Sequence, residues 1–167
     1  MEKLSTKEEK YENFVQNIIK NKKISHAYII ELCDYESDMV LVNDFIKLIL
    51  CKHACTSFDA LNCSKCNVCK LIDDFNYPDV RYIEPDGKEI KKNQLLEIIK
   101  DYGNKSMLDN KRIYVIKEAD KMNLFASNTL LKFLEEPVDD VIAILLTTNR
   151  YKIIDTVLSR CQILTIG

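Results

Sequence analysis

The cysteines are the residues whose spacing most clearly indicates chemistry. Five of the seven cysteines lie within 19 residues, and three of them form the run Cys63-x2-Cys66-x2-Cys69. Two-residue gaps allow a tight turn to direct successive thiolates at one ion, and a tetrahedral zinc site needs four such ligands. The sequence therefore predicts a structural zinc ion. The expected ligands are Cys51, Cys63, Cys66 and Cys69, with Cys55 as the alternative to Cys51.

Other interpretations of the cluster remain open. Cys51 is favoured over Cys55 because it follows the end of an expected helix, and His53 is a weaker substitute since its neighbours offer softer ligands. The same run opens a bacterial iron–sulfur motif, but residues 70–73 lack the further cysteine of that motif. A redox enzyme needs a thiol with a lowered pKa and a resolving partner, which three evenly spaced thiols do not indicate. A group of free thiols is the last alternative.

The composition limits the kind of protein that carries this cluster. The 167 residues are 47% hydrophobic and 30% charged, which is typical of one globular domain and excludes collagenous, low-complexity and disordered chains. The net charge of -2 disfavours DNA binding by this chain alone, because many phosphate contacts require a basic surface. The N-terminus has no apolar stretch typical of a secretory signal, and no apolar run reaches the length of about 20 residues that spans a membrane. We therefore expect a cytoplasmic protein with reduced cysteines.

Segments with helical periodicity alternate with short apolar segments along the chain. Helices are expected at 7–20, from a cap at Ser37 to about Cys51, around 95–102, from Asn123 to before Pro137, and at 153–159. Strands are expected at 27–33, 80–84, 112–118, 141–147 and 162–166. This alternation predicts an α/β domain with a largely parallel five-stranded sheet and helices on both faces. The cysteine-rich segment, about 51–75, is an insertion after the second helix.

Several short segments occur in an order that resembles a known family. They are Ser25-His26-Ala27-Tyr28, Tyr77-Pro78-Asp79-Val80, Glu118-Ala119-Asp120-Lys121-Met122, the stretch 128–137 that ends in Leu-Glu-Glu-Pro, and Ser159-Arg160-Cys161-Gln162. Together with the cysteine module they resemble the N-terminal AAA+ domain of bacterial clamp-loader subunits of the replicative DNA polymerase. Leu-Glu-Glu-Pro followed by Ser-Arg-Cys at this spacing is highly specific. The resemblance runs from about residue 8 to 167 and implies a RecA-like AAA+ fold.

The resemblance separates two kinds of subunit by their nucleotide motifs. The motor type hydrolyses ATP and carries a glycine-rich phosphate loop ending in Gly-Lys-Ser/Thr, whereas the delta-prime type can lack it. That loop works because glycines let backbone N–H groups converge on phosphate oxygens while the lysine supplies charge. Here the corresponding turn has no glycine and no lysine. It reads Asp34-Tyr35-Glu36-Ser37-Asp38, and its three carboxylates would repel a triphosphate.

The second nucleotide motif also departs from the family pattern. The third strand should end in Asp-Glu, with the aspartate holding magnesium, but Lys117-Glu118 stands there, and a lysine cannot coordinate a cation. We therefore predict that this chain binds neither ATP nor magnesium and resembles the delta-prime type.

Ser159-Arg160-Cys161 keeps the family pattern. The resemblance implies that Arg160 reaches into a neighbouring subunit's ATP site as an arginine finger, a task that suits guanidinium because it is always charged and forks onto phosphate oxygens. The alternative is an arginine that is solvated at the entrance to a strand. By composition, Glu135 and Glu136 belong to the exposed edge of a helix, and a role in subunit contact is implied only by the resemblance.

We therefore expect a noncatalytic clamp-loader subunit that assists ATP-dependent loading of the sliding clamp onto primed DNA. Its implied partners are the motor ATPase and delta-like subunits of a DNA polymerase holoenzyme and, indirectly, the clamp and the primer–template DNA. The alternatives are an active ATPase motor subunit with an unusual loop and a stand-alone zinc-binding interaction domain. Family members continue into a helical lid and a collar, and neither fits after Gly167. Residues 1–167 are therefore expected to hold the AAA+ domain alone.

Overall fold

The computed structural model describes residues 2–21, 24–51, 66–103 and 111–166. Within these ranges five strands form one sheet in the order β2-β3-β4-β1-β5, and every neighbouring pair is parallel. The strands are β1 (Ala27–Glu31), β2 (Val80–Ile83), β3 (Arg112–Ile116), β4 (Val141–Thr147) and β5 (Gln162–Thr165). The predicted α/β architecture with a five-stranded parallel sheet is confirmed.

β4 is the central strand because its sequence is apolar almost throughout. Its seven residues are all buried. β1 and β3 flank it, so that Ile29 and Ile116 lie opposite Leu145 from either side. A continuous apolar run is what a strand covered on both faces requires. Successive side chains alternate between the faces, so Ile144 enters one hydrophobic core and Leu145 the other.

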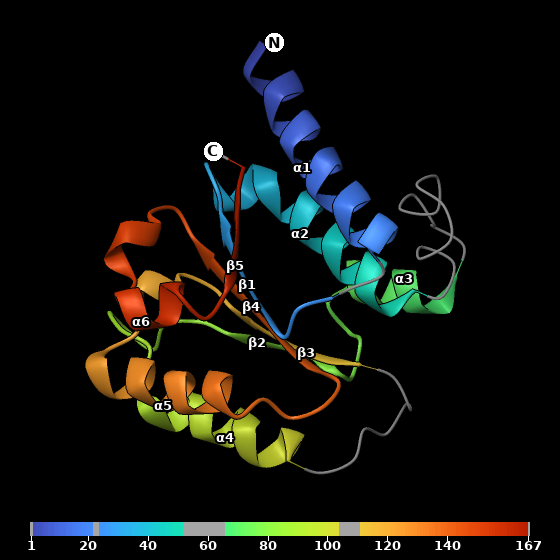
Figure 1. Ribbon diagram of the computed structural model, residues 1–167. Coiled ribbons are helices and arrows are strands. Elements are labelled where there is room, and N and C mark those ends of the chain that lie inside the picture. Colours follow the sequence, from blue (N-terminus) through green and yellow to red (C-terminus); the bar gives the residue numbers. More distant parts are fainter. Residues whose placement is uncertain (1, 22–23, 52–65, 104–110, 167) are drawn as a thin grey trace.

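Helices cover both faces of the sheet, as Figure 1 shows. One face is covered by α1 (Glu2–Asn21), α2 (Tyr35–Leu50) and α3 (Asn67–Asp73), and the other by α4 (Lys92–Tyr102), α5 (Leu124–Glu135) and α6 (Asp155–Leu158). Two short 3-10 helices, η2 (Ala119–Lys121) and η3 (Arg150–Lys152), follow β3 and β4. In the described part of the chain, no helix combines the length and the apolar character needed to cross a membrane.

Most predicted elements form close to the expected residues, but the start of α2 was predicted wrongly. Asp34, not Ser37, is the N-cap, and its carboxylate accepts a hydrogen bond from the Ser37 N–H at 3.0 Å. The helix therefore begins earlier, and it carries Glu36 and Asp38 in its first turn, where the helix dipole favours negative charge. The expected cap at Asn123 is present, since its side chain accepts from the Ala126 N–H at 2.8 Å.

The cysteine-rich insertion is described only in part. α3 and the turn after it belong to the described residues, whereas 52–65 lie outside them. Cys55, Cys63 and His53 therefore lie outside the described residues, while Cys51, Cys66 and Cys69 lie within them.

Candidate functional site

The parallel sheet has two different edges, and only one of them is the usual place for a ligand. In parallel α/β proteins ligands bind outside the carboxyl ends of the strands, where loops and helix N-termini gather. In this chain that edge is formed by the turn after β1, the loop after β2, η2 and η3. A cavity lies at each edge.

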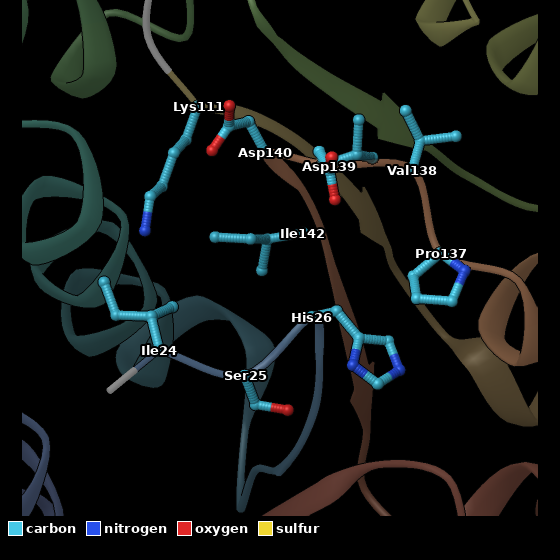
Figure 2. A pocket seen from close by; sticks show the side chains of 10 residues that line it. Ile24, Ser25, His26, Lys111, Pro137, Val138, Asp139, Asp140 and Ile142 are labelled. Atoms are coloured by element: carbon cyan, nitrogen blue, oxygen red, sulfur yellow. The ribbon is translucent and has the colours of Figure 1, made fainter.

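The cavity in Figure 2 lies at the amino edge. Its volume is about 210 Å³, and its lining comes from the segments before β1, β3 and β4. Figure 2 shows the side chains of Ser25, His26 and Lys111 arranged around Ile142. The Nε2 atom of His26 is buried and has no hydrogen-bond partner within the described residues. This cavity is opposite the edge where parallel sheets bind nucleotides, so it is not the counterpart of a phosphate site.

At the carboxyl edge, two backbone N–H groups of the turn after β1 donate hydrogen bonds to the side-chain carboxylate of Asp38. Asp38 is 4% exposed. Its Oδ2 accepts hydrogen bonds from the N–H of Cys33 at 2.8 Å and of Asp34 at 3.1 Å. In a phosphate-binding turn, N–H groups at this position point at phosphate oxygens. Here a carboxylate from the first turn of α2 takes that role.

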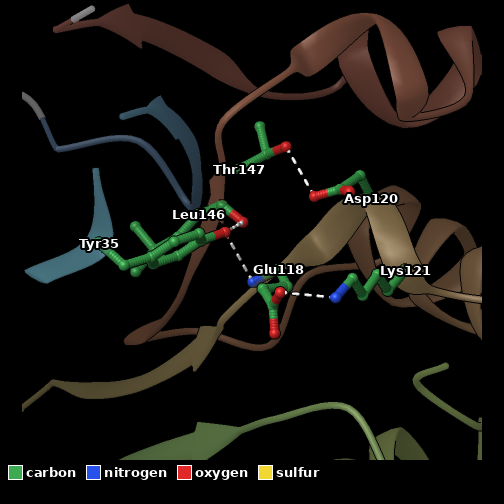
Figure 3. A network of polar contacts seen from close by, with 6 residues as sticks. All are labelled: Tyr35, Glu118, Asp120, Lys121, Leu146 and Thr147. Atoms are coloured by element: carbon green, nitrogen blue, oxygen red, sulfur yellow. Dashed lines mark hydrogen bonds and ion pairs between the residues drawn. The ribbon is translucent and has the colours of Figure 1, made fainter. Parts of the chain in front are cut away.

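Tyr35, the first residue of α2, joins this turn to the ends of β3 and β4. Figure 3 shows its hydroxyl group donating to the Leu146 carbonyl at 3.1 Å and accepting from the Glu118 N–H at 2.9 Å. Burial raises the pKa of Tyr35, so its phenol is neutral and able to donate. The phenol thus lies between the strand ends and satisfies one backbone group from each.

Glu118 and Lys117 are each held in an ion pair with a near neighbour. The Glu118 carboxylate contacts the Lys121 ammonium at 2.7 Å, and the Glu118 backbone is left-handed, with a φ of 51° that is uncommon outside glycine. The Lys117 ammonium lies 3.1 Å from the Glu84 carboxylate. It also lies over the Phe75 and Tyr82 rings, at 5.8 and 5.3 Å from their centroids.

Beside Tyr35 lies the cavity of the carboxyl edge, with a volume of about 450 Å³. Tyr35, Met39, Pro85 and Gly87 line it together with the two ion pairs just described. Farther along the edge, the Thr147 hydroxyl group donates to the Asp120 carboxylate at 2.8 Å, which ties the end of β4 to η2. Both lysines that line the cavity are neutralised by glutamates, so its described lining offers no unpaired cation to a polyphosphate.

The three described cysteines of the insertion come together. The Sγ atoms of Cys51, Cys66 and Cys69 all lie within 4.8 Å of one another, and Cys51 Sγ is 3.7 Å from Cys66 Sγ. The Cys66 sulfur also accepts the Cys69 N–H at 3.3 Å. Sulfurs about 2.3 Å from a tetrahedral zinc ion are about 3.8 Å apart, so this donor set fits such a metal. Burial raises the pKa of the Cys69 thiol.

Arg160 lies on the surface just after α6. Its Nη2 atom is 3.4 Å from Glu135 Oε1 at the end of α5, and both side chains are about half exposed. Ser159 donates its hydroxyl hydrogen to the Thr156 carbonyl at 3.0 Å. Burial raises the pKa of the Cys161 thiol to about 12, so this thiol stays protonated at neutral pH. Cys161 packs against the core and anchors the segment, while Arg160 faces solvent.

Sequence reasoning missed that the three acidic residues of the turn have different structural roles. It treated Asp34, Glu36 and Asp38 as three equivalent repelling charges, but Asp34 caps α2, Asp38 is buried on the turn's N–H groups, and only Glu36 is exposed without such a task. It also missed Tyr35 as a bridge and Glu135 as the partner of Arg160. The position of an acid in the first turn of a helix was the available signal for Asp38.

The strand order and the helices on both faces define a RecA-like AAA+ domain, and solved structures agree. The crystal structure of a DNA polymerase III gamma subunit-related protein from Thermotoga maritima superposes with a TM-score of 0.65 at 20% identity, covering 95% of this chain and 46% of that one. The RuvB Holliday junction branch migration motor of the same organism gives a TM-score of 0.54 at 10% identity, covering 96% of this chain and 44% of that one.

Sequence comparison identifies the family. The chain belongs to the family described as DNA polymerase III, delta subunit, which matches residues 7–167. It is 35% identical over 152 residues to DNA polymerase III subunit delta' of Bacillus subtilis (strain 168), covering 89% of this chain and 44% of that protein. It is 34% identical to subunit tau of the same organism, covering 26% of that protein. The chain thus spans less than half the length of these relatives, and the resemblance to a clamp-loader AAA+ domain is confirmed.

The Tyr35 bridge can be tested by Tyr35→Phe. Removing the hydroxyl group leaves the Glu118 N–H and the Leu146 carbonyl without this partner, so we expect the free energy of unfolding to fall by about 1–3 kcal/mol. Urea denaturation followed by circular dichroism measures the change. The control is Tyr151→Phe, because Tyr151 is 79% exposed and its hydroxyl group accepts a hydrogen bond only from the Arg150 guanidinium within the described residues. Equal losses in the two variants would contradict the bridge.

Proposed function

We propose that this chain is a noncatalytic subunit of the DNA polymerase III clamp loader. In this proposal it assists ATP-dependent loading of the sliding clamp onto primed DNA, together with the motor ATPase and delta-like subunits. Its relatives are delta', tau and gamma subunits of DNA polymerase III, which supports a place in that complex. The family match argues against a stand-alone zinc-binding interaction domain.

The observation that carries the noncatalytic role is the occupied turn after β1. The Cys33 and Asp34 N–H groups are bonded to a buried carboxylate, and a phosphate entering there would meet that negative charge. Such a turn gains from a phosphate only when its N–H groups are available. The active motor alternative would require Asp38 and Tyr35 to leave their hydrogen bonds, and it would still lack a lysine at the turn.

The second motif supports the same role. Lys117 carries a positive charge where a magnesium ion would need an oxygen ligand, and its ammonium is directed at Glu84 and two aromatic rings. Glu118 is the residue that would position a water molecule, and Lys121 holds its carboxylate. Binding and hydrolysis of ATP are therefore both disfavoured in this chain.

Arg160 is the group that this chain offers to a neighbour in our proposal. It is exposed, its guanidinium has a single described contact, and the partly buried Cys161 packs against the core and anchors the backbone beside it. A planar guanidinium that is always charged can fork onto phosphate oxygens of ATP bound by another subunit and stabilise the charge that develops during hydrolysis. The ATP and the water would be held by that subunit, and this chain would complete the site.

We further propose that the cysteine cluster holds a structural zinc ion. The described ligands would be Cys51, Cys66 and Cys69, whose sulfur separations fit a tetrahedral site, and Cys63 would supply the fourth sulfur. Cys51 is the C-cap of α2 and Cys66 is the N-cap of α3, so the ion would hold the end of α2 against the start of α3. Bound zinc supplies folding free energy rather than chemistry at such a site.

Zinc content tests the cluster. We expect about one zinc ion per chain in the wild type, and loss of most of it in Cys51→Ser because three ligands hold zinc less tightly than four. Cys33→Ser is the matched control, since Cys33 is exposed and lies outside the cluster. Elemental analysis of protein purified without chelator gives the count. Iron, no metal, or zinc lost from Cys55→Ser but retained in Cys51→Ser would contradict the assignment.

Nucleotide binding tests the noncatalytic role. Isothermal titration of the chain with ATP and magnesium should show no binding tighter than about 1 mM, because the turn's N–H groups are occupied and the cavity's lysines are paired. A motor subunit of the same organism, titrated under identical conditions, provides the positive control. Micromolar affinity for ATP would establish the motor alternative.

Arg160→Ala tests whether Arg160 contributes to ATP hydrolysis in a neighbouring subunit. Arginine fingers contribute about 10³–10⁵ in kcat in GTPases, but this chain would complete one of several sites, so we expect a partial loss of ATPase activity and a larger loss of clamp loading. Arg160→Lys should not restore either activity, since lysine keeps the charge and loses the planar fork. The measurement uses the full-length protein reconstituted with its partner subunits, clamp and primed DNA.

The variant should fold as the wild type does, because Arg160 is exposed. Thermal unfolding of the variant and gel filtration of the reconstituted complex check folding and assembly. Unchanged ATPase and loading in a correctly assembled complex would return Arg160 to the role of a solvated surface residue.

A further inference from the structure

The fold brings the two most specific sequence motifs of this chain into contact. Glu135, of the Leu-Glu-Glu-Pro segment, is the last residue of α5, and Arg160, of the Ser-Arg-Cys segment, follows α6. Their side chains meet at 3.4 Å between Glu135 Oε1 and Arg160 Nη2, across 25 residues of sequence. α5 and α6 pack against each other, so this contact lies at the joint of two packed helices.

A glutamate at this position is not explained by helix stability. The C-terminus of an α-helix carries partial negative charge, which disfavours acidic side chains there. α5 nevertheless ends with Glu135 and continues with Glu136 as its C-cap. Of these two acids, Glu135 has an ion pair with Arg160, whereas Glu136 is exposed and has no ion pair among the described residues. The pairing is therefore specific to one of two adjacent carboxylates.

The geometry of the contact leaves most of the guanidinium available. Only Nη2 of Arg160 meets Glu135, and the Nη1 and Nε donors have no partner within the described residues. A free arginine side chain samples many rotamers, and that freedom must be lost when it binds phosphate. A contact on one edge of the guanidinium reduces the number of rotamers that the side chain samples before it binds phosphate. The other N–H donors remain available for a new acceptor.

We propose that Glu135 is a positioning residue for Arg160. It holds one edge of the guanidinium so that the remaining donors point away from this chain and toward the ATP of an adjacent subunit. The inference rests on the proposed role of Arg160 in trans and goes beyond it by assigning a task to a residue of the Leu-Glu-Glu-Pro segment. Glu135 does not touch ATP in this scheme and acts only through Arg160.

The test compares Glu135→Ala with Glu136→Ala, which removes the same type of side chain from the adjacent position. In the reconstituted full-length complex with clamp and primed DNA, Glu135→Ala should lower kcat for ATP about two- to fivefold, the range expected for loss of one half-exposed ion pair. KM for ATP should be unchanged, and Glu136→Ala, which leaves the ion pair of Arg160 intact, should lower kcat less than Glu135→Ala does. Glu135→Gln should be intermediate, since its amide oxygen still accepts from Nη2.

A double-mutant cycle separates positioning from a merely structural role. In the Arg160→Ala background, Glu135→Ala should have no further effect on kcat, because the residue through which it acts is gone. The difference between Glu135→Ala and the wild type should also shrink as salt screens the pair. Thermal unfolding and gel filtration confirm that every variant folds and assembles.

Each contrary outcome has a distinct meaning. Equal effects of Glu135→Ala and Glu136→Ala, or an additive loss in the Arg160→Ala background, would overturn the positioning role while leaving the finger intact. A rise in kcat for Glu135→Ala would also overturn it, because Glu135 would then restrain the arginine. Normal kcat and loading in Arg160→Ala alone would remove the finger, and with it the positioning role.

Discussion

The arrangement of the carboxyl edge depends on how the backbone N–H groups after β1 are satisfied. Any chain that turns from a buried strand into a helix exposes donors at this point, and donors in a protein interior must find an acceptor. A phosphate is one solution, and this chain uses the buried Asp38 carboxylate instead. With the turn closed internally, Tyr35 is placed to join the ends of β3 and β4, and the neighbouring lysines pair with glutamates. The polar groups named here are thereby paired within the chain, without a ligand.

The two faces of the molecule have separate tasks that follow from this closed edge. On one face, α2 runs from the turn to its C-cap Cys51, so this helix joins the residues that close the turn to the cysteine cluster, whose Cys66 and Cys69 belong to the start of α3. On the other face, α5 runs from η2 to Glu135, so it links the second nucleotide motif to the contact with Arg160. Both sets of helices pack on the same sheet, whose central strand β4 is buried on both faces, and this packing fixes their positions. In the proposed role, the domain binds no nucleotide of its own and still presents Arg160 at its surface.

Much of the fold could be predicted from the sequence because apolar runs and helical periodicity extend over many residues and indicate which segments are strands and which are helices. The apolar run 141–147 predicted a strand, and the alternation of helices and strands predicted a parallel sheet, since both depend on burial that a sequence displays directly. The start of α2 was misplaced because Asp34 and Ser37 are both good caps and the choice depends on local geometry. The pairing of Glu135 with Arg160 and the bridge by Tyr35 join segments 25 and 83 residues apart, and spacing gives no sign of such contacts.

The burial of Asp38 also limits how this domain can evolve. A mutation that replaces its carboxylate removes an acceptor from two N–H groups, and it supplies neither the glycines nor the lysine of a phosphate loop. A first step that removes Asp38 therefore lowers stability before any affinity for nucleotide is gained. Because most proteins have little stability to spare, such intermediates are selected against. In the proposed noncatalytic role, a lost nucleotide site would therefore be hard to restore, because restoring it begins with a loss of stability.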